Sequence, residues 1–340
     1  MKNILIIRRD NIGDLVCTTP LIEGAKTAFP DANIYLLINT VSHDVVKNNP
    51  FIKHTFVYRK AKHASGKAAK VGVYLDRFKM FLQLRRIHFD AAILANPVPC
   101  RYSLRLARMA GVKHIIGADT GNKTISVPFS RADFSGDHQV EHTFSYLSAI
   151  SDARIAIPGV RIWLTDEERN SARQRINQLQ PHQKVGLAVH ISSRSEKRRW
   201  PLERYVAIIQ HYLQEQSGSV LIFWSPQGTL APDDVGDQHR AEQVLAACQS
   251  PRVSLYPTAS VRELVAAFEQ CEQILCSDGG QMHLAAAVNK KQVVLFGDTD
   301  IKSWHPWSGS YQILQTPSGD CIDVSVEDVR NGFARLNAMN

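Results

Sequence analysis

Short apolar runs alternate with amphipathic patterns along the whole chain. Short runs bounded by polar turns are typical of buried strands, and apolar positions that recur every third or fourth residue are typical of helices. In the first half we expect strands at 4–7, 34–38, 54–58, 91–95 and 114–116, and helices at 15–28, 73–86 and 102–110. In the second half we expect strands at 185–190, 220–224, 253–256, 273–276 and 293–296, and helices at 202–216, 238–248, 261–270 and 282–289. This alternation predicts parallel sheets covered by helices on both faces.

The two runs predict an α/β protein of two doubly wound domains. Its 340 residues suit two domains of about 150 residues each. The boundary is expected between residues 151 and 184, around a charged helix at 166–178. We expect a first domain at 1–165, a second at 180–325 and a C-terminal helix at 326–340 that packs back on the first domain. Two such domains facing one another bind ligands in a cleft at the carboxyl ends of their strands.

The composition is that of an ordinary globular enzyme, with 44% hydrophobic and 21% charged residues. No apolar run approaches the roughly 20 residues needed to cross a bilayer. The first apolar run, at 4–7, is too short for the core of a signal peptide, so we expect a cytoplasmic protein. The six cysteines form no CxxC pair and most lie in apolar segments, which predicts reduced thiols without disulfides or a zinc site.

The net charge of +8 indicates anionic partners, and the excess is concentrated between residues 59 and 86. That segment has one acidic residue, Asp76, against these basic ones: Arg59, Lys60, Lys62, Lys67, Lys70, Arg77, Lys79, Arg85 and Arg86. It is either a solvated surface or a docking patch for an anionic acceptor or an anionic membrane leaflet, with Arg59, Lys60 and Lys62 as the acceptor-binding residues. No nucleic-acid-binding motif accompanies it, so nucleic acid is not an expected partner.

The loop after the first strand offers the first candidate for catalysis. Gly13 permits a tight turn and Asp14 opens the following helix, without a GxGxxG dinucleotide fingerprint. An aspartate at a helix start often caps free N–H groups. The alternative is that Asp14 faces the cleft as a general base.

Two loops in the second domain offer a phosphate site. Residues 190–201 follow a strand and combine Ser192 and Ser193 with four cations, which suits a diphosphate as well as a solvated basic loop. Residues 276–287 run from a strand through Asp278-Gly279-Gly280 into a helix of small residues. Its N-terminus can bind a phosphate, although an ordinary capped joint and a core histidine at His283 would give the same pattern. A further strand ends in a glycine turn at 293–300.

Together these segments resemble glycosyltransferase family nine, the ADP-heptose:lipopolysaccharide heptosyltransferases. The matching pieces lie in order over nearly the whole chain: Ile-Gly-Asp at 12–14 followed by Thr19-Pro20, Lys-Arg-Arg-Trp-Pro at 197–201, Ser-Asp-Gly-Gly-Gln-Met-His-Leu-Ala-Ala-Ala at 277–287, and Leu-Phe-Gly-Asp-Thr at 295–299.

The resemblance implies a GT-B fold, in which two Rossmann-like domains face one another across a cleft. It also implies inverting transfer, without a metal or other cofactor, from a nucleotide diphosphosugar such as ADP-heptose. The implied acceptor is an anionic, lipid-linked glycan of the lipopolysaccharide core, met at the inner face of the cytoplasmic membrane. Asp14 matches the base, and Lys197 or Arg198 matches the residue that binds donor phosphate. The implied donor site comprises Ser192, Ser193, Asp237, Asp278, Gly279, Gly280 and His283.

The sequence departs from the family pattern in ways that keep alternatives open. Gly279 replaces a hydroxyl residue, the basic loop carries an extra residue, and Asp298 stands where many relatives have Pro or Ser. A different nucleotide sugar and a non-catalytic nucleotide- or glycan-binding module are the alternatives. The pattern H-x-x-E-H at 138–142 fits some zinc peptidases, but the two-domain parallel architecture favours the start of a helix instead.

Overall fold

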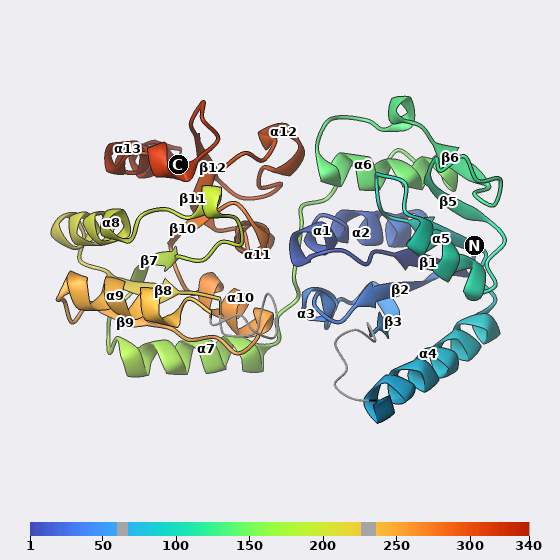
Figure 1. The fold of residues 1–340 in the computed structure, drawn as a ribbon, viewed down its shortest axis with the longest axis horizontal. Coiled ribbons are helices and arrows are strands. Elements are labelled where there is room, and N and C mark those ends of the chain that lie inside the picture. The colour runs from blue at the N-terminus through green and yellow to red at the C-terminus, as the bar shows by residue number, and fades with distance from the viewer. Residues whose placement is uncertain (60–66, 226–235, 340) are drawn as a thin grey trace. The chain divides into compact units, whose positions relative to one another are not determined.

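The computed structural model describes residues 1–59, 67–225 and 236–339. The chain divides into two compact units, Met1–Arg161 and Ile162–Asn340, so the division lies within the expected interval (Figure 1). Each unit is built on one six-stranded sheet. The predicted α/β fold of two doubly wound domains is therefore confirmed.

The first unit has the strand order β3-β2-β1-β4-β5-β6, and every neighbouring pair is parallel. Residues Ile4, Leu5, Ile6 and Ile7 of its central strand are fully buried, because helices cover both faces of the sheet. Its elements are β1 (Asn3–Ile7), α1 (Ile12–Val16), α2 (Thr19–Ala28), β2 (Asn33–Asn39), α3 (His43–Val46), β3 (Ile52–Tyr58), α4 (Lys67–Ile87), β4 (Ala91–Leu94), α5 (Arg101–Met109), β5 (Ile115–Ala118), β6 (Val127–Phe129), η2 (Arg131–Asp133), α6 (Gln139–Ser145) and η3 (Tyr146–Ala149).

The second unit repeats this topology with the order β12-β11-β10-β7-β8-β9, again all parallel. Its elements are α7 (Asp166–Leu179), β7 (Val185–His190), η4 (Glu196–Arg198), α8 (Leu202–Glu215), β8 (Ser219–Phe223), α9 (Gln238–Cys248), β9 (Val253–Leu255), α10 (Val261–Glu269), β10 (Gln273–Ser277), α11 (Gly280–Ala287), β11 (Lys291–Phe296), α12 (Ile301–Trp304), β12 (Tyr311–Gln315), η5 (Cys321–Asp323) and α13 (Val326–Ala338).

Both sheets reverse their strand order next to the first strand of the unit. The reversal lies between β1 and β4 in the first unit and between β7 and β10 in the second. Loops leave such a point in opposite directions and open a crevice at the carboxyl ends of the strands. The two candidate sites are therefore expected at these two strand pairs.

The structure corrects some predicted elements. The helix expected at 15–28 is two helices, α1 and α2, because Pro20 stands in the first turn of α2. The edge strands β6 and β12 were not predicted: β6 is three residues long and contains Pro128, and β12 carries polar residues that weaken the apolar signal.

The C-terminal helix packs within the second unit. We expected it to pack back on the first domain, but α13 contacts β11, β12 and α8. Val329 and Leu336, seven residues apart on one helical face, join the hydrophobic cluster that contains Leu295 and Leu314. Amphipathicity predicted that this helix buries one face, and only the structure identifies the sheet beneath it.

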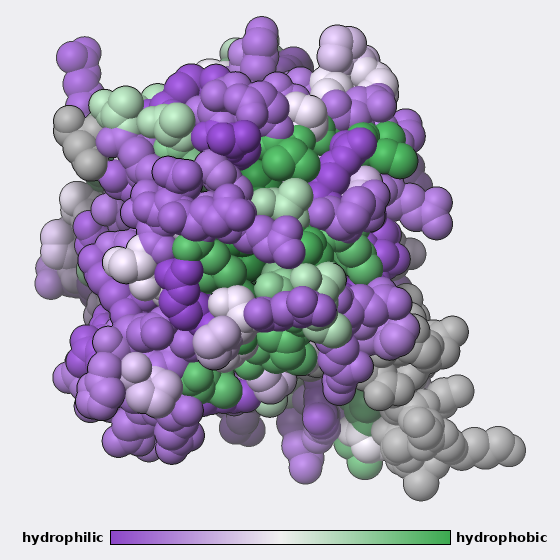
Figure 2. Space-filling view, turned by 90° about the vertical axis from the view of Figure 1, so that its left-hand side faces the viewer, coloured by the Kyte–Doolittle hydropathy of each residue, from purple (hydrophilic) through white to green (hydrophobic). Residues whose placement is uncertain are grey.

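The helices of the second unit carry polar outer surfaces. The face in Figure 2 is mainly hydrophilic, with hydrophobic residues gathered near its middle between hydrophilic margins. This is the pattern of amphipathic helices packed over an apolar layer. Within the described residues, no helix is both long and apolar enough to cross a membrane.

A partly buried ion pair joins α7 and α10 of the second unit. Arg262 of α10 is buried and contacts both carboxylate oxygens of Glu168 in α7, and it also donates to the carbonyl of Trp163 at 2.6 Å. The hydrogen bonds from Arg262 are the main reason that the pKa of Glu168 is lowered to about 2. The pair therefore fixes α7 against α10.

Replacing Glu168 tests the contribution of this pair. Glu168→Gln should lower the free energy of unfolding by about 2 kcal/mol at pH 7, less than the full pKa shift implies because part of the carboxyl meets solvent. A lowered pKa stabilises the fold above the ordinary value of 4.5, and this stabilisation is lost as the pH falls towards about 2, so the two proteins should converge there. Urea unfolding followed by tryptophan fluorescence measures this, since all five tryptophans lie in the second unit. Glu167→Gln, at the exposed neighbouring position, is the control. An equal loss of unfolding free energy in both variants would contradict a stabilising role for the Glu168–Arg262 pair.

Candidate active site

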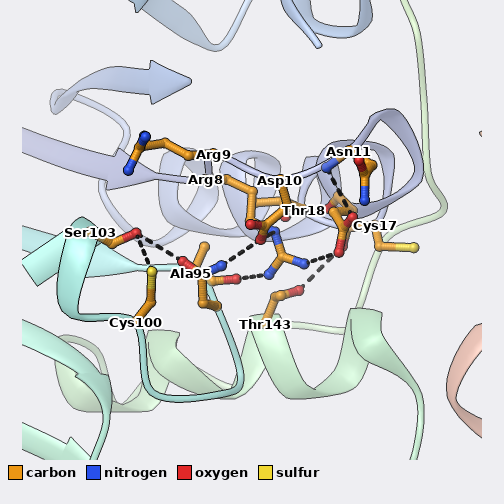
Figure 3. Close-up of polar contacts among 12 residues, drawn as sticks. Arg8, Arg9, Asp10, Asn11, Cys17, Thr18, Ala95, Cys100, Ser103 and Thr143 are labelled. Carbon is orange, nitrogen blue, oxygen red and sulfur yellow. Dashed lines mark hydrogen bonds and ion pairs between the residues drawn. The ribbon is translucent and has the colours of Figure 1, made fainter. Parts of the chain in front are cut away.

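A buried arginine organises the carboxyl end of β1. Arg8 is 2% exposed, and one of its Nη atoms donates to the carbonyl of Ala95 beyond β4. Its Nε lies 3.1 Å from Oδ2 of Asp10, and the other Nη lies 2.6 Å from Oδ1 of Asp14. Figure 3 shows the Arg8 guanidinium beside Asp10 and Ala95, with Arg9 pointing away from them. One cation thus fixes two carboxylates at the point where the sheet order reverses.

Asp10 is held by groups from three neighbouring strands. Asn96, which follows β4, donates its amide N–H to Asp10, and Asn39 at the end of β2 donates to the carbonyls of Arg9 and Asp10, both at 2.7 Å. Burial raises the pKa of the Asp10 carboxyl, the Arg8 charge opposes that rise, and the Asp14 charge adds to it. The Asp10 carboxyl is therefore more readily protonated than an ordinary aspartate.

Asp14 caps the start of α1 and keeps part of its side chain exposed. Its Oδ2 accepts the backbone N–H of Asn11 at 3.1 Å, as a helix-capping carboxylate does. The side chain remains 16% exposed at the carboxyl end of β1, so it can still meet a substrate. Thr18 donates its hydroxyl to the Asp14 carbonyl at 2.8 Å and fixes the turn between α1 and α2. The general-base role stays a prediction.

The second site is formed by three loops that follow β7, β10 and β11. Gln281 of α11 donates to the carbonyl of Ser277 at 2.8 Å and to the carbonyl of Ser192 at 3.3 Å. The Ser192 hydroxyl accepts the backbone N–H of Ser225, beyond β8, at 2.9 Å. Ser192 and Ser193 are both buried. The loops at 192–198 and 278–283 therefore meet, as their positions in the sequence predicted.

An ion pair joins these loops. Arg198 lies 3.2 Å from the carboxylate of Asp278, which also accepts the hydroxyl hydrogen of Thr299 from the β11 loop. Burial raises the pKa of Asp278, while Thr299 and Arg198 oppose that rise. A Cβ added at Gly297 would lie 2.8 Å from Cγ of Arg198, so only glycine lets the basic loop pack this closely.

The two candidate phosphate-binding cations differ in their surroundings. The Arg198 side chain is 28% exposed, and its buried Nε makes no hydrogen bond within the described residues. Lys197 is about half exposed and pairs at 3.4 Å with the equally exposed Asp298. Arg198 therefore has a spare donor among the three loops, whereas Lys197 lies on their outer side.

Gly279 has a backbone that explains the departure from the family pattern. It is the N-cap of α11 with φ +157° and ψ −168°, a conformation that is almost exclusive to glycine. A Cβ there would also lie 2.8 Å from Oε1 of Gln281. Gly280 opens α11, whose N-terminal amides are suited to an anion. His283 is buried one turn further on, with its ring centroid 6.0 Å from that of Trp304.

Asp237 lies at the edge of the same strand ends. It is the buried N-cap residue of α9, 3.5 Å from Nε of Arg240, and its N–H donates to the carbonyl of Ser225 at 3.2 Å. Burial lowers the pKa of His190, the last residue of β7, to about 4, and the charge of Asp237 opposes this shift. His190 is thus neutral at physiological pH.

The remaining sequence predictions concern the basic segment and the H-x-x-E-H pattern. Arg59 is exposed and pairs with Asp76 at 3.6 Å, while Lys60 and Lys62 lie outside the described residues. Residues 138–142 form a helix start: Glu141 accepts the N–H of His138 at 2.9 Å and His138 accepts that of Val140 at 3.1 Å. Over the ranges that the structure describes, no group of three or more His, Cys, Asp or Glu is placed to hold a metal.

Several polar residues of these sites were missed from the sequence. They share one signal, since each stands at or just beyond the carboxyl end of a strand, or opens the helix that follows. Such polar positions become informative once the strand order is known, because neighbouring parallel strands bring them together. The missed residues are Arg8, Asp10, Asn39, Asn96, Gln281 and Thr299.

The fold and these strand-end sites define the class of protein: a GT-B glycosyltransferase built from two Rossmann-like domains. The profile of glycosyltransferase family 9 (heptosyltransferase) matches residues 77–332. The chain belongs to this family, which confirms the resemblance, and it is a glycosyltransferase.

Individual relatives agree with this assignment. Lipopolysaccharide heptosyltransferase 3 of Escherichia coli is 24% identical over 330 residues, which cover 94% of this chain and 90% of the relative. The family 9 glycosyltransferase of Veillonella parvula has a crystal structure with a TM-score of 0.81 and 18% identity, covering 100% of this chain and 98% of that one. The E. coli heptosyltransferase solved with ADP-2-deoxy-2-fluoro heptose has a TM-score of 0.73 and 16% identity, covering 98% and 99%.

The role of Arg8 can be tested through stability. Arg8→Met removes the cation that keeps the pKa of Asp10 from rising further, so the variant should lose about 3 kcal/mol of stability at pH 7. A carboxyl whose folded pKa lies above its unfolded value stabilises the fold at low pH and loses that contribution as pH rises. The deficit should therefore shrink as the pH falls towards about 4. Hydrogen exchange of β1 and β4 amides would report it, and Arg9→Met, which removes a charge with a smaller effect on the pKa of Asp10, should show a smaller deficit. A pH-independent deficit would refute the electrostatic role.

Proposed function

We propose that this protein transfers a heptose from ADP-heptose to an anionic, lipid-linked acceptor of the lipopolysaccharide core, with inversion and without a metal ion. The observation that carries the proposal is the meeting of the three loops after β7, β10 and β11. They gather Arg198, Asp278 and the N-terminus of α11 at one strand-order reversal. The lipopolysaccharide heptosyltransferase among the relatives and the structure with an ADP-heptose analogue support the choice of acceptor and donor.

The second unit provides the chemistry for a diphosphate leaving group. Negative charge grows on the donor phosphate as the bond to the anomeric carbon breaks, and prepositioned cations and N–H groups stabilise it. We assign the direct phosphate contact to Arg198, because its side chain is 28% exposed where the three loops meet. Asp278 fixes the guanidinium, and the amides at Gly280 add the positive end of a helix dipole. These groups serve in place of a divalent cation.

The first unit provides the base. In the proposed step, Asp14 takes the proton of the acceptor hydroxyl, whose oxygen attacks the anomeric carbon on the face opposite the diphosphate. The bond from carbon to phosphate oxygen breaks, ADP leaves with that electron pair, and the sugar configuration inverts. Arg8 fixes the orientation of the Asp14 carboxylate through the 2.6 Å ion pair. We place the reaction in the cytoplasm, in keeping with six free cysteines.

Removing the base is the experiment that tests the function. Asp14→Asn should lower turnover from ADP-heptose by about 100-fold or more, as expected for loss of a general base. Its affinity for ADP should stay unchanged. Asp10→Asn is the matched control in the same loop, and its turnover should fall by less than about tenfold. Wild-type protein that binds ADP-heptose but neither transfers nor hydrolyses it would indicate a binding module instead.

The assays are run in EDTA. Transfer should proceed at its full rate there, because protein cations occupy the place of a metal. An absolute requirement for Mg²⁺ or Mn²⁺ would contradict the proposed leaving-group chemistry.

The donor site can be tested with two adjacent cations. Arg198→Ala should weaken ADP binding by about tenfold or more, the size of one lost charge-assisted phosphate contact. Lys197→Ala makes the same charge change one residue away and should weaken it by less than about threefold, since this side chain is paired on the outer side. Isothermal titration with ADP measures both. The reverse order of effects would assign the phosphate contact to Lys197.

A further inference from the structure

Helix α4 exposes a continuous apolar stripe. Its members are between 42% and 63% exposed. Their spacing of three and four residues places them on one side of the helix. The stripe consists of Val71, Tyr74, Leu75, Phe78 and Leu82.

The fold of the first unit does not require this stripe. At about 100° per residue, Met80 and Leu84 point away from the stripe and Phe81 lies at its margin, and all three join the core cluster of the first unit. Scattered apolar residues are ordinary on a protein surface, but a contiguous row marks an interaction site. Figure 1 shows α4 at the edge of the first unit. One side of α4 therefore packs on the first unit, and the apolar stripe on the other side is exposed.

The charges around the stripe are almost all positive. Lys79 and Arg86 are exposed beside it, and Asp76, the sole acidic residue in the sequence of α4, already pairs with Arg59. The neighbouring helix α5 has no acidic residue and exposes three arginines, together with Tyr102 at 72%. Arg85 joins the two helices through a 3.0 Å hydrogen bond to the carbonyl of Met109. The arginines of α5 are Arg101, Arg105 and Arg108.

We infer that α4 docks on an anionic phospholipid bilayer, lying in the plane of the interface. The apolar stripe enters the boundary between headgroups and acyl chains, and the basic residues of α4 and α5 contact anionic headgroups. A second copy of this chain fits less well, because the basic margins of two copies would face one another and repel. The inference deepens the proposed function and rests on it in one respect: a lipid-linked acceptor is met at such a surface.

Vesicle binding by the full chain tests the inference. The probes are vesicles of phosphatidylcholine alone and vesicles with about one third phosphatidylglycerol. Each basic residue near an anionic surface strengthens binding by about fivefold at low salt. Co-flotation should therefore be strong with the anionic vesicles and at least about tenfold weaker with the neutral ones. It should also decline as salt is raised. No binding to the anionic vesicles would overturn the inference.

Two double variants separate the apolar and charged contributions. Leu75→Gln with Phe78→Gln keeps helix propensity and should weaken anionic-vesicle binding about tenfold or more. Lys79→Gln with Arg86→Gln should also weaken it by about tenfold and flatten its salt dependence. Exposed positions in the second unit provide matched controls, Ile322→Gln and Arg330→Gln, which should bind as wild type. Equal loss in variants and controls, or none in either, would contradict a specific surface.

Two further measurements distinguish this inference from the proposed function and from self-association. Transfer to a water-soluble, delipidated acceptor should be the same in the Leu75/Phe78 variant and wild type. If the Leu75/Phe78 variant loses vesicle binding but retains transfer, the result supports the docking surface independently of the proposed function. If the wild-type protein binds vesicles but transfers no sugar, only the proposed function is refuted. Light scattering gives the oligomeric state, and a dimer that the Leu75/Phe78 changes dissociate, without vesicle binding, would assign the stripe to a second copy.

Discussion

The reversal of strand order beside the first strand of each sheet is the constraint on which both candidate sites depend. A parallel sheet buried on both faces leaves polar groups few positions except the ends of its strands. β1 and β4 in the first unit, and β7 and β10 in the second, are the pairs at which the connecting loops diverge. Charged side chains collect there because the crevice gives them partial access to water while the apolar strands stay covered.

Charges so close to an apolar core must have partners. Arg8 could not remain 2% exposed without the carboxylates of Asp10 and Asp14 and the carbonyl of Ala95. Asp278 is also buried with partners, because its carboxylate contacts both Arg198 and Thr299. These ion pairs hold the side chains in place before any substrate arrives, which lowers the reorganisation that a bound transition state requires. Packing and chemistry therefore impose the same arrangement.

The sequence predicted the parts of the structure that depend on local pattern. Buried strands such as β1 and β7 are short apolar runs, and α11 follows directly from its glycine turn and small residues. Local pattern could not identify β12, whose polar residues hide an edge strand, or the surface on which α13 packs, since one apolar face suits any sheet. These depend on pairing between distant segments.

The candidate sites divide in the same way. Asp14, Ser192 and Asp278 could be found because each lies in a motif beside a strand. Arg8 and Asn96 could not, because they are 88 positions apart in the sequence and only the pairing of β1 with β4 brings them together. Gly279 is instructive in another way: it departs from the family pattern, yet its φ of +157° shows a backbone that a hydroxyl residue would strain. The departure is a change of backbone as well as of side chain.

The two units share one topology but carry different residues at the reversal point. In the first unit a single buried cation, Arg8, contacts two carboxylates, one of which, Asp14, is the proposed base. In the second unit Arg198 and Lys197, each paired with an aspartate, accompany the α11 N-terminus at the proposed phosphate site. Glycosyl transfer requires both, because a proton must leave the attacking hydroxyl while negative charge grows on the departing diphosphate. Two units of the same topology place the proposed base and the proposed phosphate site on separate strand ends, so each can have the surroundings that its part of the reaction requires.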